Sequence, residues 1–425
     1  MIKSFFVHQF KSISRTELSL TDLTILIGSN GSGKSNLMEA LRILSESASG
    51  QPLAVITDGS RNIGSAIRGG SNGCPQMPHT SFELGCTFEC DAYNLVYRIT
   101  ISTKKGVQID KESLTRIYTE GDKKEEIFSA LQLENGYLSV TCLSDRFDDY
   151  KRQINVSPYI SVLSQIGNLM PTDSKVLIHS KEDVKTLSQA LAKMFFFQPQ
   201  IELMRNYVRI GEAKLKPDGA NLSAVLYGLC QTEGQPTAIK DNILSIIRNL
   251  PDNEIKDIAF IKTELNDVIF FIKEKYNQYP MDAKKLSDGT LRCLAVVALI
   301  FSEDPGSIIV MEEPDNGIHP SRVKRLLQAT YRVAKERRIK LIMTTHNPVL
   351  MDAVDEGNAD GVVICYRDQN DGGSHFRCMV DFPDYFRLAA QGTAGSLARN
   401  DEFIKSLNRP HEDAQAFYDW LEREK

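Results

Sequence analysis

Short apolar runs and segments of helical spacing alternate at both ends of the chain. The apolar runs predict buried strands, and they cover residues 23–27, 307–311, 340–344 and 361–366. Hydrophobic residues at helical spacing adjoin these runs, over residues 36–44, 291–301 and 322–338. Strands and helices that alternate in this way are typical of a mostly parallel sheet covered by helices. We therefore expect an α/β core made from residues 1–44 and 281–380.

The middle of the chain follows different patterns. From residue 81 to residue 142, apolar and polar positions alternate and turn residues separate the runs, which predicts an inserted antiparallel β-meander. Residues 143–280 predict a helical insertion instead. Helical apolar spacing occurs there at residues 184–197, 222–229, 239–250 and 265–276.

Two further stretches look polar or irregular. Residues 45–80 are rich in Gly, Ser, Pro and Asn, which is typical of a long surface loop. Residues 381–425 form a polar tail that we expect to be helical near its end. All of these parts are expected to belong to one domain over residues 1–425.

One stretch fits a phosphate-binding loop at each of its fixed positions. Residues 28–35 read Gly-Ser-Asn-Gly-Ser-Gly-Lys-Ser and lie between a predicted strand and a predicted helix. Glycines let the backbone N–H groups turn toward phosphate oxygens, and the helix N-terminus favours negative charge. Lys34 is expected to reach the β- and γ-phosphates, and Ser35 to bind Mg²⁺. The plainer alternative is a glycine-rich turn that matches by chance. The other expected phosphate-binding residues are Asn30, Gly31, Ser32 and Gly33.

Three further motifs follow this loop, and each has a plainer alternative. Ser287 and Gly289 begin a helix and form either a second phosphate-binding end or an ordinary helix cap. Glu312 and Glu313 end an apolar strand, where one carboxylate can face Mg²⁺ and the other the attacking water, although such pairs also occur in solvated loops. His346 follows a polar strand end and can bond a γ-phosphate, although a lone histidine is often structural. Their order after the loop favours the chemical interpretation.

Composition limits the partners that this chain can bind. The formal net charge is −5 and hydrophobic residues make up 42%, which is ordinary for a soluble globular protein. No global positive field exists, so a nucleic-acid contact needs a local basic patch or a partner. The basic helix face at residues 322–338 offers such a patch, although a solvated face is the commoner case. No apolar run is long enough to span a bilayer and no signal-peptide pattern is present, so we expect a cytoplasmic protein without membrane contact.

The cysteines and two basic residues are the remaining candidates for functional sites. The eight cysteines are scattered, and the pair Cys86 and Cys90 lacks a matching second pair, which favours reduced, mostly buried thiols over a zinc site. Lys11 and Arg15 lie near a predicted turn that either approaches the nucleotide or is simply solvated.

Taken together, these motifs resemble the ATP-binding-cassette (ABC) type of ATPase, and within it the RecF, SMC and OLD-type branch. The N-terminal string QFKSI, followed by LTILIGSNGSGKSNLMEAL, resembles the heads of that branch. Ser287 and Gly289 match the signature L-S-G-G-Q, while Asp288 departs from it. The string Glu312-Glu313-Pro314, followed by His319-Pro320, resembles E-E-P-E-x-x-x-H-P of the OLD-like members. Glu312 replaces the usual aspartate, which leaves its contact with the metal either direct or through water.

A narrower resemblance covers residues 158–229, which are similar to a family of bacterial AAA-type ATPases. It rests on residues 161–165, 197–199, Arg205 and 216–222.

The resemblance implies a RecF/SMC-like ABC ATPase head that binds ATP and Mg²⁺. Glu313 is then the general base, His346 the switch histidine, and Glu312 and Ser35 the metal site. Further, Ser287 and Gly289 contact the ATP of a second protomer and His319 lies in the loop at that interface, which implies at least a homodimer. A metal-sensing glutamine is also implied. Gln165 is one candidate, Gln132 competes with it, and a plain surface role fits either.

The biological role follows from the same resemblance. Relatives of the OLD type often carry a nuclease domain after the switch histidine, for which residues 347–425 are short. The acidic residues there are better explained as surface charge, and they are Asp352, Asp355, Glu356 and Asp360. We therefore expect an ATPase subunit that regulates a separate nuclease or toxin in bacterial anti-phage defence. The alternatives are a RecF-like repair ATPase that binds DNA directly and an ATP-dependent assembly scaffold. A transporter ATPase is disfavoured.

Overall fold

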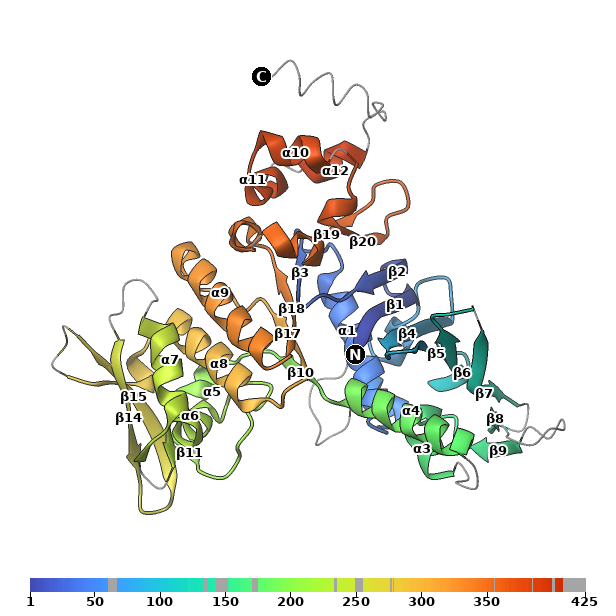
Figure 1. Cartoon of the computed structure of the whole chain (residues 1–425), viewed down its shortest axis with the longest axis horizontal. Coiled ribbons are helices and arrows are strands. Elements are labelled where there is room, and N and C mark those ends of the chain that lie inside the picture. Colours follow the sequence, from blue (N-terminus) through green and yellow to red (C-terminus); the bar gives the residue numbers. More distant parts are fainter. Residues whose placement is uncertain are drawn as a thin grey trace. The chain divides into compact units, whose positions relative to one another are not determined.

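The computed structural model describes most of the chain as two compact units (Figure 1). Unit 1 consists of Met1–Leu20, Asn30–Met194 and Cys365–Phe376, and unit 2 consists of Thr21–Ser29, Phe195–Ile364 and Arg377–Lys425. The domain boundaries expected from sequence stay a prediction. Outside the description are residues 60–66, 122, 134–135, 143–151, 170–174, 233–234, 249–254, 276, 278, 355, 384, 400–401 and 408–425.

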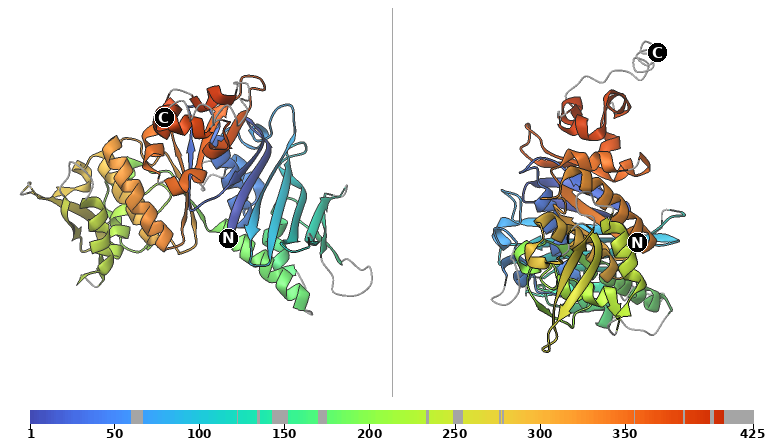
Figure 2. Two further views of the ribbon diagram at one scale, coloured as in Figure 1. Left: turned by 45° about the horizontal axis from the view of Figure 1, so that its top comes forward. Right: turned by 90° about the vertical axis from the view of Figure 1, so that its left-hand side faces the viewer.

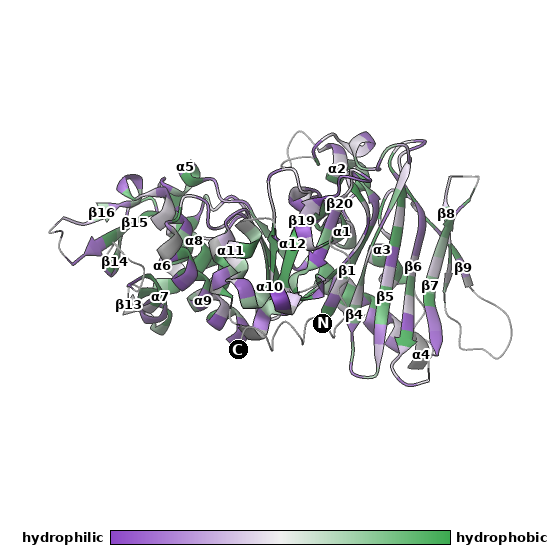
Figure 3. Ribbon diagram, turned by 90° about the horizontal axis from the view of Figure 1, so that it is seen from above, coloured by the Kyte–Doolittle hydropathy of each residue, from purple (hydrophilic) through white to green (hydrophobic). Residues whose placement is uncertain are grey.

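Unit 1 contains an eight-stranded antiparallel sheet whose strands lie side by side (Figure 2). Its strand order is β2-β1-β4-β5-β6-β7-β8-β9. Hydrophobic and hydrophilic residues are interspersed along its strands (Figure 3). In β8 buried and half-buried residues alternate, because successive side chains of a strand point to opposite faces. This confirms the predicted meander. The strands are β1 (Ile2–Phe10), β2 (Ile13–Ser19), β4 (Ser81–Glu89), β5 (Tyr93–Ser102), β6 (Gln108–Tyr118), β7 (Lys124–Gln132), β8 (Leu138–Cys142) and β9 (Arg152–Val156).

Helices of unit 1 replace much of the loop expected at residues 45–80. Pro52 precedes α2 and Gly59 ends it, so the turn-forming residues mark the ends of a helix rather than a loop. Leu53 and Ile56 of that helix are buried. The prediction of a surface loop is therefore wrong for residues 45–48 and 53–58, which are helical. The helices are α1 (Lys34–Ala48), α2 (Leu53–Asp58), η1 (Ser71–Gly73), α3 (Val162–Leu169) and α4 (Lys175–Ala192).

A six-stranded sheet carries the predicted buried strands in the order β10-β17-β18-β3-β19-β20. Adjacent strands among β17, β18, β3 and β19 are parallel. All residues of β3 and β18 are buried, as expected for a parallel sheet covered on both faces. Most of this sheet belongs to unit 2, and part of β19 and of β20 belongs to unit 1. The strands are β3 (Leu23–Ile27), β10 (Met194–Phe197), β17 (Ile308–Glu312), β18 (Lys340–Thr345), β19 (Val362–Arg367) and β20 (Ser374–Cys378).

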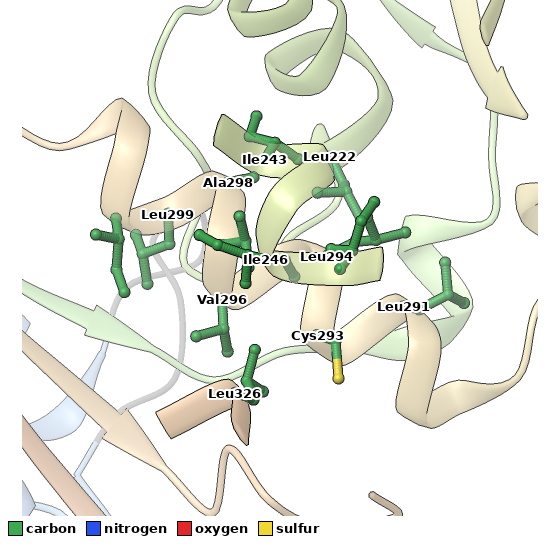
Figure 4. Packing of buried hydrophobic residues seen from close by; sticks show 14 of the residues in the cluster. Leu222, Ile243, Ile246, Leu291, Cys293, Leu294, Val296, Ala298, Leu299 and Leu326 are labelled. Carbon is green, nitrogen blue, oxygen red and sulfur yellow. The ribbon is translucent and has the colours of Figure 1, made fainter. Parts of the chain in front are cut away.

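The core of unit 2 surrounds α8 (Asp288–Ser302), which is apolar on nearly all sides because other helices and the sheet enclose it (Figure 4). Leu294 and Leu299 are fully buried there, together with Leu222 and Ile243 of neighbouring helices. These neighbours fix the start of α8 relative to the sheet. They are α5 (Ile201–Met204), α6 (Leu222–Cys230), α7 (Ala238–Arg248) and α9 (Pro320–Glu336).

Residues 267–274 form one strand of a β-hairpin, so the prediction of a helix over residues 265–276 is wrong for this part. The run Val-Ile-Phe-Phe-Ile is β-branched and aromatic, and an unbroken apolar run of this length fits a strand as well as a helix. A turn with Asn266 at φ 66° precedes it. Residues 143–280 are thus mixed rather than helical. The strands are β11 (Val208–Arg209), β12 (Gln231–Thr232), β13 (Gln235–Pro236), β14 (Ile255–Lys262), β15 (Asp267–Glu274) and β16 (Met281–Asp282).

Short helices follow β18 and β20 in unit 2. Asp352, expected as surface charge, accepts a hydrogen bond from Gly395 N at 2.7 Å and so anchors α11. Asp355 lies outside the described residues. Across the described part of the chain, no helix combines the length and apolarity needed to cross a membrane. The short helices are η2 (Ala283–Lys285), η3 (Pro348–Ala353), η4 (Glu356–Gly361), η5 (Met379–Asp381), α10 (Tyr385–Gln391), α11 (Ala394–Arg399) and α12 (Glu402–Leu407).

Candidate active site

Three strands of unit 2 end at one edge of the sheet, and each is followed by a predicted site residue. Glu312, at the end of β17, pairs with Thr344 of β18, and Thr345 pairs with Ile27 at the end of β3. The carboxyl ends of parallel strands are where α/β proteins place their ligands. The register therefore brings Glu313, His346 and Gly28, the first residue of the phosphate loop, to the same edge.

Glu313 and His346 lie next to each other at this edge. Oε1 of Glu313 is 3.4 Å from Nδ1 of His346, and half of the imidazole side chain is exposed. Glu313 has φ 45°, a conformation that costs a non-glycine residue about 1–3 kcal/mol and that concentrates at functional sites. Its backbone N–H donates to the carbonyl oxygen of Thr344 at 3.1 Å. The strained turn thus aims the carboxylate toward His346.

Glu312 has a partner that the sequence did not suggest. Its Oε2 accepts a hydrogen bond from Nε2 of Gln198 at 2.5 Å, and Gln198 directly follows β10, the strand beside β17. One feature of the sequence could have identified Gln198 as a site residue. It directly follows an apolar strand, as the other site residues do. Of the glutamines in the described chain, Gln198 is the one whose amide contacts Glu312.

The two glutamines named as candidates from the sequence make other contacts in unit 1. Nε2 of Gln165 donates to the carbonyl oxygen of Ile160 at 2.7 Å and so closes the turn before α3. Oε1 of Gln132 accepts from Nε2 of Gln108 at 3.3 Å in the meander. Neither amide is aimed at a nucleotide motif of its own unit, so the candidate roles in metal sensing are not supported for these residues.

The predicted second phosphate-binding end lies at the start of α8. Ser287 is the N-cap residue, and its Oγ accepts a hydrogen bond from Thr290 N at 3.2 Å. Gly289 lies against the loop that follows Glu313, because a Cβ there would lie 2.8 Å from the carbonyl oxygen of Gly317. Glycine at this position therefore lets α8 approach that loop closely.

Arg205 holds the loop ahead of Ser287 in place. Its Nη1 donates to the carbonyl oxygens of Ala283 and Leu286, at 3.2 and 2.8 Å. Its Nη2 donates to Oδ1 of Asp288 at 2.6 Å. Asp288 is the residue that departs from the ABC signature, and this ion pair gives a physical reason for an acid at that position. In the sequence analysis, Arg205 is named only as part of a family resemblance and no role is predicted for it.

The rest of the phosphate loop belongs to unit 1, where it fits a phosphate group. Gly33 precedes α1 at φ 103°, and a Cβ there would overlap Oγ of Ser374. Lys34 begins the helix and is buried, whereas Ser35 is exposed. Ser32 Oγ is buried and has no hydrogen-bond partner within the described residues. A curled backbone that only glycine allows, with a buried hydroxyl beside it, suits an anion with several acceptor oxygens.

Neighbouring polar residues support this loop. Asn36 Nδ2 donates to Ser12 Oγ at 2.8 Å, and Ser12 Oγ lies 2.6 Å from Ser374 Oγ. Lys11 is not simply solvated, because its ammonium forms an ion pair with Glu39 and its side chain is mostly buried. All eight cysteines are free and six of them are buried, as predicted.

A family model matches residues 23–352 of this chain. Its description is "AAA domain, putative AbiEii toxin, Type IV TA system". The chain belongs to this AAA family. The match includes the phosphate loop, the start of α8, the two glutamates and His346, and the prediction of an AAA-type ATPase is confirmed.

Individual relatives of this AAA protein are distant. A Helicobacter pylori protein named "ATP/GTP phosphatase" is 22% identical over 374 residues, which are 84% of this chain and 88% of that protein. Among solved structures, an SMC head bound to the C-terminal winged-helix domain of ScpA is 13% identical, with TM-score 0.47 over 88% of this chain and 97% of that chain. The SMC head domain from Thermotoga maritima is 15% identical, with TM-score 0.41 over 89% and 98%.

Proposed function

We propose that this AAA protein is a cytoplasmic ATPase subunit that binds ATP with Mg²⁺, dimerises around the nucleotide and so regulates a separate nuclease or toxin in anti-phage defence. The pairing of Glu313 with His346, at the edge where the phosphate loop begins, carries the proposal. The name of the Helicobacter pylori relative, an ATP/GTP phosphatase, agrees with it. The family description names a "putative AbiEii toxin" of a "Type IV TA system", which supports a toxin-related role for the chain but does not bear on a separate effector.

Each predicted site residue has a proposed part in hydrolysis. Lys34 and the N–H groups of Asn30, Gly31 and Gly33 bind the phosphates. Ser35 and Glu312 hold Mg²⁺, which supplies positive charge to the phosphates when it is bound, and Gln198 orients Glu312. Glu313 accepts the proton of the attacking water, and His346 holds the Glu313 side chain and the γ-phosphate in line.

The start of α8 is the proposed contact with a second protomer. Ser287 and Asp288 are exposed at the N-terminus of a helix of 15 residues, where partial positive charge favours a phosphate. His319 is also exposed, in the loop that packs on Gly289. A homodimer in which Ser287 of one chain binds ATP held by the other uses both features.

A second candidate function is direct binding of DNA, as in a RecF-like repair ATPase. One observation favours it. Lys324, Arg325, Arg332 and Lys335 are exposed along α9, and their spacing puts them on one face of the helix. DNA-stimulated ATP hydrolysis that is lost when Arg332 and Lys335 become glutamine would support this candidate.

The mass of the Glu313→Gln variant in solution, with and without ATP and Mg²⁺, tests the proposal. This variant keeps the phosphate loop and loses the base, so we expect bound ATP, hydrolysis slowed at least about a hundredfold, and a larger assembly. Adding Lys34→Ala should abolish the assembly. A chain that stays monomeric under both conditions would contradict the role of Ser287 in a second protomer. An equal assembly without ATP would contradict dimerisation driven by the nucleotide.

A further inference from the structure

Asp315 follows Glu313 by two residues, and its carboxylate is buried. Its Oδ2 accepts a hydrogen bond from Oγ1 of Thr345 at 2.8 Å. Asp315 is 6% exposed and Thr345 is fully buried. The other carboxylate oxygen, Oδ1, has no hydrogen-bond partner within the described residues. This hydrogen bond joins the loop after β17 to the end of β18, in addition to the bond from Glu313 N to the carbonyl oxygen of Thr344.

The hydroxyl of Thr345 also controls the chain on the far side of His346. Thr345 Oγ1 accepts from Asn347 N at 2.9 Å while it donates to Asp315. The Thr345 hydroxyl therefore bridges the residues on either side of His346, because it belongs to Thr345 and binds the backbone N–H of Asn347. Because half of the imidazole is exposed, packing alone does not fix its position, and this turn supplies the constraint.

The surroundings of Asp315 make its burial costly. Burial raises the pKa of the Asp315 carboxyl above its ordinary value, and the Thr345 hydrogen bond opposes that effect. A cavity of about 20 Å³ lies beside it, and its walls are mostly apolar. Among the lining residues are Val296, Leu326, Thr330, Met343 and Leu350. A buried carboxyl with one oxygen unpartnered is less favourable than an apolar side chain of the same size, so stability does not account for an acid here.

We propose that Asp315 is a positioning residue, which acts through the Thr345 hydroxyl to hold His346 against Glu313. The inference rests on the proposed roles of Glu313 and His346 in ATP hydrolysis. A charged acceptor orients a hydroxyl more strongly than a neutral one does, and that hydroxyl fixes both sides of the His346 peptide. Loss of this bond leaves the phosphate loop unchanged, so it is expected to slow turnover without weakening ATP binding.

The first test replaces the hydroxyl by a methyl group. Thr345→Val should lower kcat for ATP about tenfold, with the Kd for ATP unchanged, and Thr345→Ser should restore most of the turnover. Thr330→Val is the matched control, because Thr330 lines the same cavity but its hydroxyl donates to Leu326 O of its own helix, at 2.7 Å. Equal losses in Thr345→Val and Thr330→Val, or no rescue by serine, would overturn the proposal.

The second test asks whether the effect passes through His346. In a His346→Ala background, Thr345→Val should have no further effect on kcat, since interacting residues are not additive. A further tenfold loss would overturn the proposal. If His346→Ala lowers kcat and Thr345→Val does not, only the role of Asp315 and Thr345 fails. If His346→Ala leaves kcat unchanged, the role of His346 in the proposed function fails as well.

Discussion

Nε2 of Gln198 donates a hydrogen bond to Oε2 of Glu312 at 2.5 Å, which ties the end of β10 to the end of β17. If Glu312 holds Mg²⁺, Gln198→Ala should lower kcat about tenfold and raise the Mg²⁺ concentration needed for half-maximal turnover. Gln198→Glu should be worse, because a second carboxylate would lie beside Glu312. Steady-state ATP hydrolysis over a Mg²⁺ titration measures both. Gln165→Ala is the control, and an equal shift in that variant would contradict the assignment.

Arg205 should control assembly rather than nucleotide binding. Arg205→Ala frees the carbonyl groups ahead of Ser287 and the carboxylate of Asp288, so the start of α8 loses its fixed position. We expect the ATP-dependent assembly of the Glu313→Gln variant to be weakened at least about tenfold, while the monomer still binds ATP. Arg205→Lys should recover only part of this, because an ammonium cannot copy the planar fork of donors.

Lys214→Ala provides the matched control for Arg205. Lys214 forms an ion pair with Asp304 at 2.7 Å in the same unit, and half of its side chain is exposed. Exposed pairs of this kind contribute little. Analytical ultracentrifugation of the variants in ATP and Mg²⁺ compares them. An assembly constant that falls equally in both variants would mean that Arg205 acts only on stability.

Two glycines of the phosphate loop should differ in their tolerance of alanine. Both have positive φ, 82° at Gly31 and 103° at Gly33, which costs an alanine about 1–2 kcal/mol. At Gly33 a Cβ also overlaps Ser374, whereas at Gly31 no atom lies within 4 Å. Gly33→Ala should therefore weaken ATP binding far more than Gly31→Ala, by about a hundredfold against about tenfold, in a calorimetric titration. Equal losses would mean that Ser374 moves aside freely.

Glu112 should make unfolding of unit 1 depend on pH. Burial raises the pKa of this carboxyl from 4.5 to about 7, although it accepts hydrogen bonds from Val162 N and Leu163 N at the start of α3. A raised pKa means that the folded state binds the extra proton. Its contribution to stability is full below pH 4.5 and is lost as pH rises through 7, a change of about 3 kcal/mol.

Urea unfolding between pH 5 and pH 8 measures this dependence. In Glu112→Gln the free energy of unfolding should fall less steeply with rising pH, because the amide does not titrate. The comparison uses the slope, so a general loss of stability in the variant does not affect the conclusion. An unchanged slope would show that Glu112 has the same proton occupancy in both states.

Local patterns were sufficient for the strands and for the residues that follow them. The phosphate loop, Glu312, Glu313 and His346 each come directly after an apolar run, and the parallel register then brings three strand ends to one edge. The hairpin at residues 255–274 was not predictable in this way, because a short, fully apolar run has no period that separates strand from helix.

Contacts between segments that are distant in the sequence also could not be predicted. Gln198 meets Glu312 across 114 positions, and Arg205 meets Asp288 across 83. No local spacing encodes such pairs. The sequence shows that Asp288 departs from the ABC signature, but it does not show why. The reason is the ion pair with Arg205, which lies far away in the sequence, before α6.

The position of β3 in the sheet has a consequence for biosynthesis. Its neighbours are β18 and β19, which come much later in the chain. The strand that leads into the phosphate loop therefore has no sheet to join while the ribosome is still making the segments between them. Contacts of such high sequence separation form late and slowly. A nascent chain that stops before Thr345 therefore carries a phosphate loop without an active site, and premature release should yield no partly active ATPase.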